Sequence, residues 1–211
     1  MYWVVKAMEY VINHIPKRKG KRPGIKAKMT SITVHNTGNP KSTAMNERNW
    51  LVNPNNNRVA SFHIVIDEKQ AIECIPLDEV AYHSGNSEGN KTSIGIEICE
   101  SGNYKMNEQN AVELIAKMLV ERGWGIERVR THKSWSGKEC PRLILPYWND
   151  FLDSIKKEVD KLIQQKKENE VSPWAREAWK WVKENGISGG TRPKDKVTRE
   201  EMWNMLYRMR R

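Results

Sequence analysis

Cysteine is scarce in this chain. Its 211 residues include three, Cys74, Cys99 and Cys140, separated by long intervals. An odd number at such spacings does not form the even framework of a small secreted disulfide scaffold. We therefore expect synthesis in a reducing compartment.

Long apolar runs are also missing. No stretch approaches the roughly 18 apolar residues of a membrane span, so we expect no membrane insertion. Residues 1–24 mix charges into their apolar run and show no small-residue cleavage site, which predicts a protein made without an export signal. The length suits one domain of about 150 residues plus an appendage.

Basic charge is abundant but unevenly placed. The net charge of +10 divides into about +7 for residues 1–30, about −2 for 31–171 and about +5 for 172–211. Such asymmetry indicates an anionic partner. Nucleic acid is one candidate, but the sequence shows no helix-turn-helix, RNP or zinc-finger pattern. Another anionic polymer remains open.

The first half of the chain has the pattern of a sheet. Three segments alternate apolar and polar residues with the period of two expected of strands, and these are residues 31–36, 61–67 and 93–99. Residues 70–77 add a short strand. A short helix is expected after the first strand, capped by Ser42 and ended by the Asn-Pro pair at 53–54.

The second half is mainly helical. Residues 106–122 carry an apolar stripe of helical period with Gly123 at the expected C-terminal cap, and residues 147–167 repeat the pattern before a polar end. Residues 172–211 predict two further helices around a loop. The first opens with Ser172 as N-cap and Pro173 at the first helical position, and the second opens with a capping box of Thr198 and Glu201.

Strand alternation places titratable residues on one face of the sheet. His35 points away from Ile32 and Val34, His63 away from Phe62, Ile64 and Ile66, and Glu97 away from Ile94, Ile96 and Ile98. If helices cover the apolar face, the opposite face carries His35, His63 and Glu97. Such a convergence is typical of a functional site.

A loop later in the chain could complete a metal site. Residues 131–141, "THKSWSGKECP", have a loop composition and would bring His132 and Cys140 to His35. Two imidazoles and a thiolate suit Zn²⁺, and three protein ligands with an open position is the catalytic arrangement. Taken singly, each histidine could be an ordinary hydrogen-bonded residue and Cys140 a small buried hydrophobe, so the residues alone leave both interpretations open.

Five ordered motifs resemble a known family. They are "ITVHNTGN", "SFHIVID", "AYHSG", "IGIEIC" and "HKSWSGKECP". Over roughly residues 10–160 the chain resembles the zinc-dependent N-acetylmuramoyl-L-alanine amidases of the amidase-2 family, relatives of peptidoglycan recognition proteins, and above all the endolysins of phages of Gram-positive bacilli. The resemblance implies an α/β fold with a mixed central β-sheet and packed helices, and hydrolysis of peptidoglycan at the amide between N-acetylmuramic acid and L-alanine.

The resemblance also implies roles for individual residues. His35, His132 and Cys140 would hold one Zn²⁺. Glu97 would act as general base and then acid, and Lys138 would stabilise the oxyanion. Some relatives carry a catalytic tyrosine before the histidine of the second strand, where this chain has Phe62, so proton transfer falls to Glu97.

Four further residues are candidates for the substrate groove or its support: His83, His63, Asn36 and Thr37. For His83 the alternative is a structural hydrogen-bonding role, and the same alternative holds for His63. Glu97 could otherwise be an exposed strand carboxylate and Lys138 a solvated loop lysine; the order of the motifs favours the catalytic interpretation of both.

The tail resembles a single surface-layer-homology repeat, a module that anchors proteins to anionic wall polymers. It departs from that family in having one copy and an atypical loop, "GISGGTRPKDKV". Its tryptophans could equally form a core or an interface. We predict an amidase domain at 1–160, a linker at 161–171 and a wall-binding helical module at 172–211.

The predicted partners are peptidoglycan and, through the tail, an anionic wall polymer, with no nucleic acid. Without an export signal, the resemblance implies a product made in the host cytoplasm and released to the wall through a holin-type lesion. A rival of another class is a recognition module that binds peptidoglycan without cutting it. The presence of Cys140, Glu97 and Lys138 favours the enzyme over this rival.

Overall fold

A computed structural model describes residues 8–210, so the first seven residues of the predicted amidase domain and the last residue of the predicted tail module lie outside the described part. The chain forms two compact units, residues 1–158 and 159–211, which are described separately below. No helix of the described residues is both long and apolar enough to cross a membrane.

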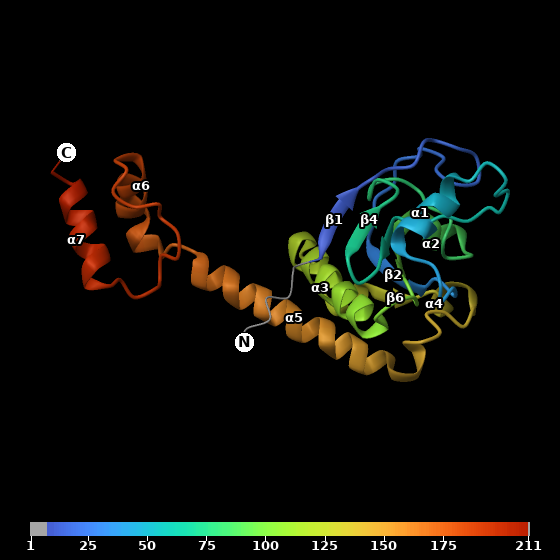
Figure 1. Cartoon of the computed structure of the whole chain (residues 1–211). Coiled ribbons are helices and arrows are strands. Elements are labelled where there is room, and N and C mark those ends of the chain that lie inside the picture. The colour runs from blue at the N-terminus through green and yellow to red at the C-terminus, as the bar shows by residue number, and fades with distance from the viewer. Residues whose placement is uncertain (1–7, 211) are drawn as a thin grey trace. The chain divides into compact units, whose positions relative to one another are not determined.

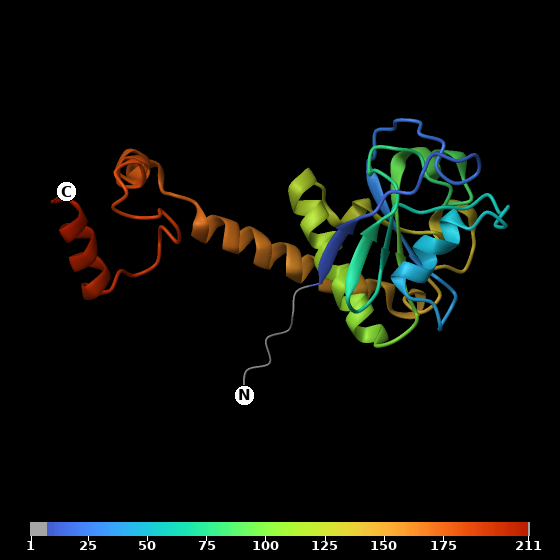
Figure 2. The same cartoon turned by 45° about the horizontal axis from the view of Figure 1, so that its top comes forward.

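The first unit is built on a six-stranded sheet of order β1-β4-β3-β5-β2-β6 (Figure 1). The strands are β1 (Glu9–Ile12), β2 (Ser31–Asn36), β3 (Ile64–Ile66), β4 (Gln70–Glu73), β5 (Ser93–Ile98) and β6 (Val129–Thr131). All neighbouring pairs are parallel except β3 and β4, which are antiparallel. The expected mixed sheet is therefore confirmed, and Figure 2 shows the blue β1 beside the teal β4 at one edge.

The register aligns the residues that matter for the site. His35 of β2 lies directly opposite Glu97 of β5, and Val65 of β3 lies opposite Glu97 on the other side. Because β2, β5 and β6 run parallel, their carboxyl ends lie at one edge of the sheet. Ligand sites of α/β sheets form at this edge.

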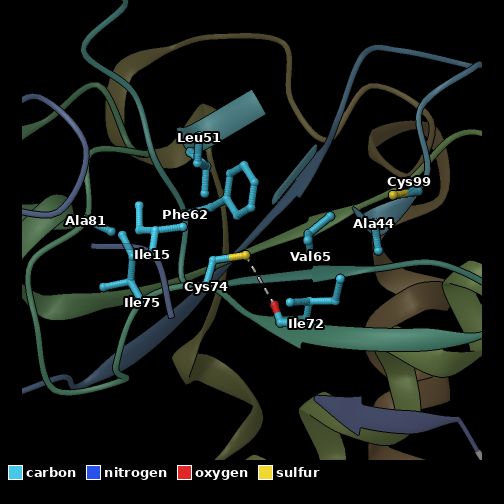
Figure 3. Close-up of a cluster of buried hydrophobic side chains, with 10 residues drawn as sticks. All are labelled: Ile15, Ala44, Leu51, Phe62, Val65, Ile72, Cys74, Ile75, Ala81 and Cys99. Carbon is cyan, nitrogen blue, oxygen red and sulfur yellow. Dashed lines mark hydrogen bonds between the residues drawn. The ribbon is translucent and has the colours of Figure 1, made fainter. Parts of the chain in front are cut away.

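Helix α1 (Ala44–Val52) covers part of the face that carries Val65. Figure 3 shows the apolar cluster beneath it, in which Leu51 of α1 lies beside Phe62 and above Val65. The strand expected at 61–67 begins only at Ile64, so Phe62 is outside the alternation and does not point to the face opposite His63. The cap of α1 is Thr43, whose hydroxyl accepts a hydrogen bond from the Asn46 amide, and the prediction of Ser42 was wrong by one residue.

Helix α3 (Tyr104–Arg122) packs on β3 and β5. By alternation the isoleucines at 64, 66, 94, 96 and 98 point away from Val65, and each is fully buried. Helix α3 supplies the apolar side chains opposite them, including Ile115 and Leu119. Its predicted C-terminal cap is confirmed, since Gly123 has φ +62°, a conformation that favours glycine.

Several short elements complete the unit. They are α2 (Ser87–Thr92), the 3₁₀ turn η1 (Ile126–Arg128), α4 (Lys133–Ser136), and the 3₁₀ turn η2 (Leu145–Tyr147). Helix α5 (Trp148–Asn169) follows and buries Phe151 and Ile155. Residues 161–169 of the predicted linker continue this helix, and the division into domains stays a prediction.

The second unit contains the 3₁₀ turn η3 (Pro173–Ala175) and helices α6 (Arg176–Glu184) and α7 (Arg199–Arg208). The capping box of Thr198 and Glu201 is confirmed, whereas the Ser172 side chain makes no cap hydrogen bond. The indole N–H of Trp179 donates a hydrogen bond to the Gly190 carbonyl at 2.8 Å, which links α6 to the loop between α6 and α7. Within residues 159–210, Ile187 is the only apolar residue that is buried.

Candidate metal centre

Three predicted metal ligands meet at the carboxyl edge of the sheet. His35 is near the end of β2, His132 directly follows β6, and Cys140 lies on the loop after α4. The loop returns to its start because the Lys133 amide donates to the Cys140 carbonyl at 3.0 Å. All three ligand side chains are buried, and their candidate donor atoms lie within 4.8 Å of one another.

The separations fit a single small cation. The Nδ1 atoms of His35 and His132 are 3.0 Å apart, and Sγ of Cys140 is 3.7 Å from Nδ1 of His35. In a tetrahedral zinc site with normal bond lengths, two nitrogens lie about 3.3 Å apart and nitrogen and sulfur about 3.6 Å apart. The donor set and its spacing therefore suit Zn²⁺.

Hydrogen bonds determine which nitrogen of His35 is free for a metal. Nε2 of His83 lies 2.9 Å from the Ser93 carbonyl, which can only accept, so this nitrogen carries the proton. Nδ1 of His83 must then accept, at 3.0 Å, the hydrogen bond that Nε2 of His35 donates. Nδ1 of His35 is left with a lone pair, as a metal ligand requires.

His132 is arranged in the same way. Burial lowers its pKa to about 4, with the charge of Lys138 as a second cause, while a hydrogen bond to the Ser84 backbone acts in the opposite direction. Nδ1 of His132 lies 3.0 Å from Nδ1 of His35, so the two nitrogens are close enough to bind one cation together.

The surroundings favour neutral groups unless a cation is present. Burial, followed by the neighbouring His83 and His132, holds the pKa of His35 well below its usual range. Burial also raises the pKa of the Cys140 thiol to about 11, and the charge of Glu97 contributes. A divalent cation would reverse the effect on the thiol, because it stabilises the thiolate directly.

A cavity of about 480 Å³ opens beside the three ligands. Besides the ligands, it is lined by five of the other predicted site residues: Asn36, Thr37, His83, Glu97 and Lys138. The pKa of Glu97 is raised to about 8, mainly by burial and also by the charge of Glu47, while Lys138 acts in the opposite direction. Among the described residues, Oε2 of Glu97 and Oγ1 of Thr37 are buried without a hydrogen-bond partner, so both are available to a molecule in the cavity.

Asn36 supports the ligand loop with its side chain. Its Oδ1 accepts a hydrogen bond from the Leu143 amide at 3.0 Å, and its Nδ2 donates to the Tyr104 hydroxyl at 3.0 Å. The first of these bonds ties β2 to the segment that follows Cys140. Asn36 therefore acts on the site mainly by positioning.

His63 is not among the residues that line the cavity. It is fully buried, its Nδ1 accepts from the Gly95 amide at 2.9 Å, and its Nε2 donates to the Glu79 carbonyl at 2.8 Å. Both ring nitrogens are thus engaged by backbone. This favours a structural role for His63 over contact with substrate.

The cavity also has lining residues that sequence reasoning did not single out as site residues. They are Asn39, Glu47, Trp50, Arg58, Val59, Ala60, Ser61, Phe62, Tyr82, Gly85 and Ser136. Most of them lie on α1 or on irregular segments, where no periodicity assigns a face. The position of Tyr82 next to His83 in the "AYHSG" motif was an available signal.

Comparisons with known proteins agree with this geometry. The Amidase_2 family model, described as N-acetylmuramoyl-L-alanine amidase, matches residues 25–143. The chain is 42% identical over 166 residues to the N-acetylmuramoyl-L-alanine amidase CwlA of Bacillus subtilis, with 74% of this chain and 60% of the relative covered. It is 41% identical over 145 residues to XlyB of the same organism, with 64% and 45% covered. The chain thus spans 60% or less of the length of these two relatives.

The fold also matches a solved structure described as the catalytic domain of XlyA. The TM-score is 0.66 at 36% sequence identity, with 70% of this chain and 99% of that chain covered. The mixed α/β fold is thereby confirmed.

Proposed function

The chain belongs to the Amidase_2 family, and from that membership we propose that it hydrolyses the amide between N-acetylmuramic acid and L-alanine in peptidoglycan. The observation that carries the proposal is that His35, His132 and Cys140 lie together beside the half-buried Glu97. The place of action would be the bacterial cell wall.

We propose that His35, His132 and Cys140 hold one Zn²⁺. When bound, the ion would polarise the amide carbonyl and make a water molecule acidic enough to give hydroxide near neutral pH. His83 would keep Nδ1 of His35 free by accepting the proton of its Nε2. Asn36 would hold the Cys140 loop in place.

Proton transfer falls to Glu97 in this proposal. Its carboxyl group lines the cavity, its pKa lies near 8, and one oxygen has no partner among the described residues. Such a group can accept the proton of the attacking water and deliver it to the leaving alanine nitrogen. Phe62 lines the same cavity but has no proton to exchange.

Lys138 would stabilise the negative charge that develops on the carbonyl oxygen. Its ammonium group lies close enough to lower the pKa values of both His35 and His132. A fixed cation near the reacting carbonyl favours the transition state over the ground state. The His83 ring would form part of the groove wall.

The proposal is tested by measuring loss of turbidity of Gram-positive cell walls together with release of new alanine amino termini. We expect Cys140→Ser to lose bound zinc and activity, and chelator to abolish the activity of the unaltered protein. We expect Glu97→Gln to keep zinc but to lose about 10²–10⁴-fold in kcat.

Two variants serve as matched controls. Glu139→Gln removes an exposed carboxylate next to Cys140 that pairs with Lys133, and Cys74→Ala alters a buried cysteine of the apolar cluster. Both should keep zinc and activity. Full activity of Cys140→Ser and of the chelated protein would exclude the zinc mechanism, and binding of walls without cleavage would indicate a recognition module.

We also propose that residues 172–211 bind an anionic wall polymer. This segment has a net charge of about +5. A cavity of about 520 Å³ in the second unit is lined by three cations, Arg192, Lys196 and Arg208, against two carboxylates, Asp195 and Glu201. Cations around a cavity favour an anionic ligand.

A further inference from the structure

Helix α7 turns a mainly polar face toward the interior of the second unit. Four of its residues line the cavity of that unit, and they are Glu201, Asn204, Met205 and Arg208. Their spacing of three, four and seven positions places them on one face of the helix. Arg208 also donates to the carbonyl of the buried Ile187 at 3.3 Å. The orientation of α7 about its axis is therefore fixed by contacts within the unit.

The opposite face of α7 is apolar and exposed. Four residues form it, and we call them the outer face: Met202, Trp203, Leu206 and Met209. A helix on the surface of a globular domain normally has the reverse arrangement, with its apolar stripe toward the core. Helix α6 follows that rule, because its residues Ala178, Trp179 and Val182 line the cavity. The outer face of α7 thus carries apolar side chains that the unit itself does not cover.

Cations stand at both ends of the outer face. Arg199 and Arg210 are both exposed, and the Arg199 guanidinium group lies 6.0 Å from the centre of the Trp203 ring. Of the two glutamates of α7, Glu201 is held in the capping box and faces the cavity, and Glu200 lies by helical spacing at the flank of the outer face. The outer face therefore combines apolar and aromatic side chains with positive charge.

This combination restricts what can cover the outer face. In a contact between two copies of α7, parallel or antiparallel, the arginines at its ends would meet arginines, and like charges disfavour association. A hydrophilic wall polymer would leave the apolar side chains in contact with water. An anionic phospholipid surface suits both kinds of side chain, because apolar groups enter the acyl boundary while arginine and tryptophan stay at the level of the headgroups.

We propose that the outer face of α7 binds an anionic phospholipid surface, with the helix lying in the plane of the headgroups. This goes beyond the hydrolysis proposed above, and it uses a different side of α7 from the cavity assigned to a wall polymer. The net charge of about +5 on residues 172–211 draws the unit to such a surface. The ten residues of α7 bury only a short apolar stripe, so the binding is peripheral and reversible.

The test measures co-sedimentation of the full chain with vesicles of phosphatidylcholine that contain about one third phosphatidylglycerol, and with vesicles of phosphatidylcholine alone. The unaltered chain should bind the anionic vesicles roughly tenfold more tightly. The double substitution Trp203→Ala and Leu206→Ala should weaken that binding about tenfold, because two apolar side chains no longer leave water. The ratio between the two proteins should persist at high salt, which screens charges but not the apolar contact.

Ile12→Ala with Ile25→Ala is the matched control, because both isoleucines are exposed in the first unit. This pair should bind the anionic vesicles as the unaltered chain does, and equal melting temperatures would show that both variants are folded. Equal binding by the two variants would mean that net charge alone attracts the chain, and would overturn the proposal. Failure of the unaltered chain to bind vesicles would also overturn it. Dimers that only the Trp203 and Leu206 variant dissolves would assign the outer face to a second copy instead.

Discussion

Position 95 in β5 requires a glycine, because the His83 ring packs directly against it. A Cβ atom at this position would stand 2.5 Å from Cγ of His83, which is closer than packed atoms come. His83 in turn sets the tautomer of His35 through the 3.0 Å hydrogen bond between them. Gly95 therefore affects the orientation of His35 indirectly, through the position of the His83 ring.

We expect Gly95→Ala to weaken zinc binding. The added methyl group would displace His83 and disturb the orientation of His35, and loss of such an outer contact lowers metal affinity by roughly 10–100-fold. Competition with a chromophoric chelator measures the change. Gly189→Ala is the control, because a Cβ there meets nothing within 4 Å and no positive φ is involved. Equal zinc affinity of Gly95→Ala and the unaltered chain would contradict the prediction.

Lys21 makes the stability of the first unit depend on pH. Its pKa is about 8 in the folded chain against 10.5 for an ordinary lysine. Below pH 8 both states are protonated, and the folded state bears the full cost of the buried charge. Between pH 8 and 10.5 the folded state loses its proton first, so this cost declines as the pH rises.

We expect the stability advantage of Lys21→Met over the unaltered chain to fall between pH 7 and pH 10. The change should be on the order of 2 kcal/mol, from linkage between the two pKa values. Urea unfolding at both pH values measures it. Lys105→Met alters an exposed lysine of α3, and its difference from the unaltered chain should stay constant. A constant difference for Lys21→Met would mean that the lysine keeps an ordinary pKa.

The site residues differ in how far the sequence could predict them. His35 and Glu97 follow from alternation along two strands, and the resemblance of the motifs joins His132, Cys140 and Lys138 to them. Arg58 could not be found in this way, because it lies on an irregular segment whose course depends on hydrogen bonds made by Arg18 and Lys21. Those contacts join residues more than thirty positions apart, and no local pattern records them.

At the scale of elements, α1 connects the core to the cavity. Leu51 is fully buried in the apolar cluster, while Glu47 and Trp50 of the same helix line the cavity. The burial of Leu51 on one face of α1 thereby fixes the positions of Glu47 and Trp50 at the cavity. The strongly alternating strands and the long helix α3 were predictable, whereas β1, β6, α2 and α4 span six residues or fewer and are too short to show a period.

We expect Leu51→Ala to lower the free energy of unfolding by about 2–5 kcal/mol, because it removes buried methyl groups and leaves a cavity. Leu206→Ala is the matched control, since the same side chain on α7 is 55% exposed and should cost less than about 0.5 kcal/mol. Chemical denaturation measures both. A large cost for Leu206→Ala would show that something covers this face of α7.

At the scale of the whole molecule, positive charge is concentrated in two parts of the sequence. Residues 1–30 carry about +7 and belong to the first unit, residues 172–211 carry about +5 and belong to the second, and residues 31–171, which include the candidate metal ligands, carry about −2. The composition alone shows this distribution. The exposure of the tail tryptophans could not be predicted, because helical spacing alone allowed a core or an interface: Trp174 is 88% exposed and Trp203 is 60% exposed.

We expect the full chain with Arg192→Gln and Lys196→Gln to bind cell walls more weakly, because both cations line the cavity of the second unit. Co-sedimentation with walls should fall several-fold at low salt, and the difference should shrink as salt screens the charges. The control is Lys105→Gln with Lys117→Gln, which removes the same charge from the exposed face of α3. Cleavage of a soluble muramyl peptide should stay unchanged in both pairs, since neither touches the metal centre. Equal co-sedimentation of the two pairs would leave only a general effect of net charge and would remove the proposed wall-binding role of residues 172–211.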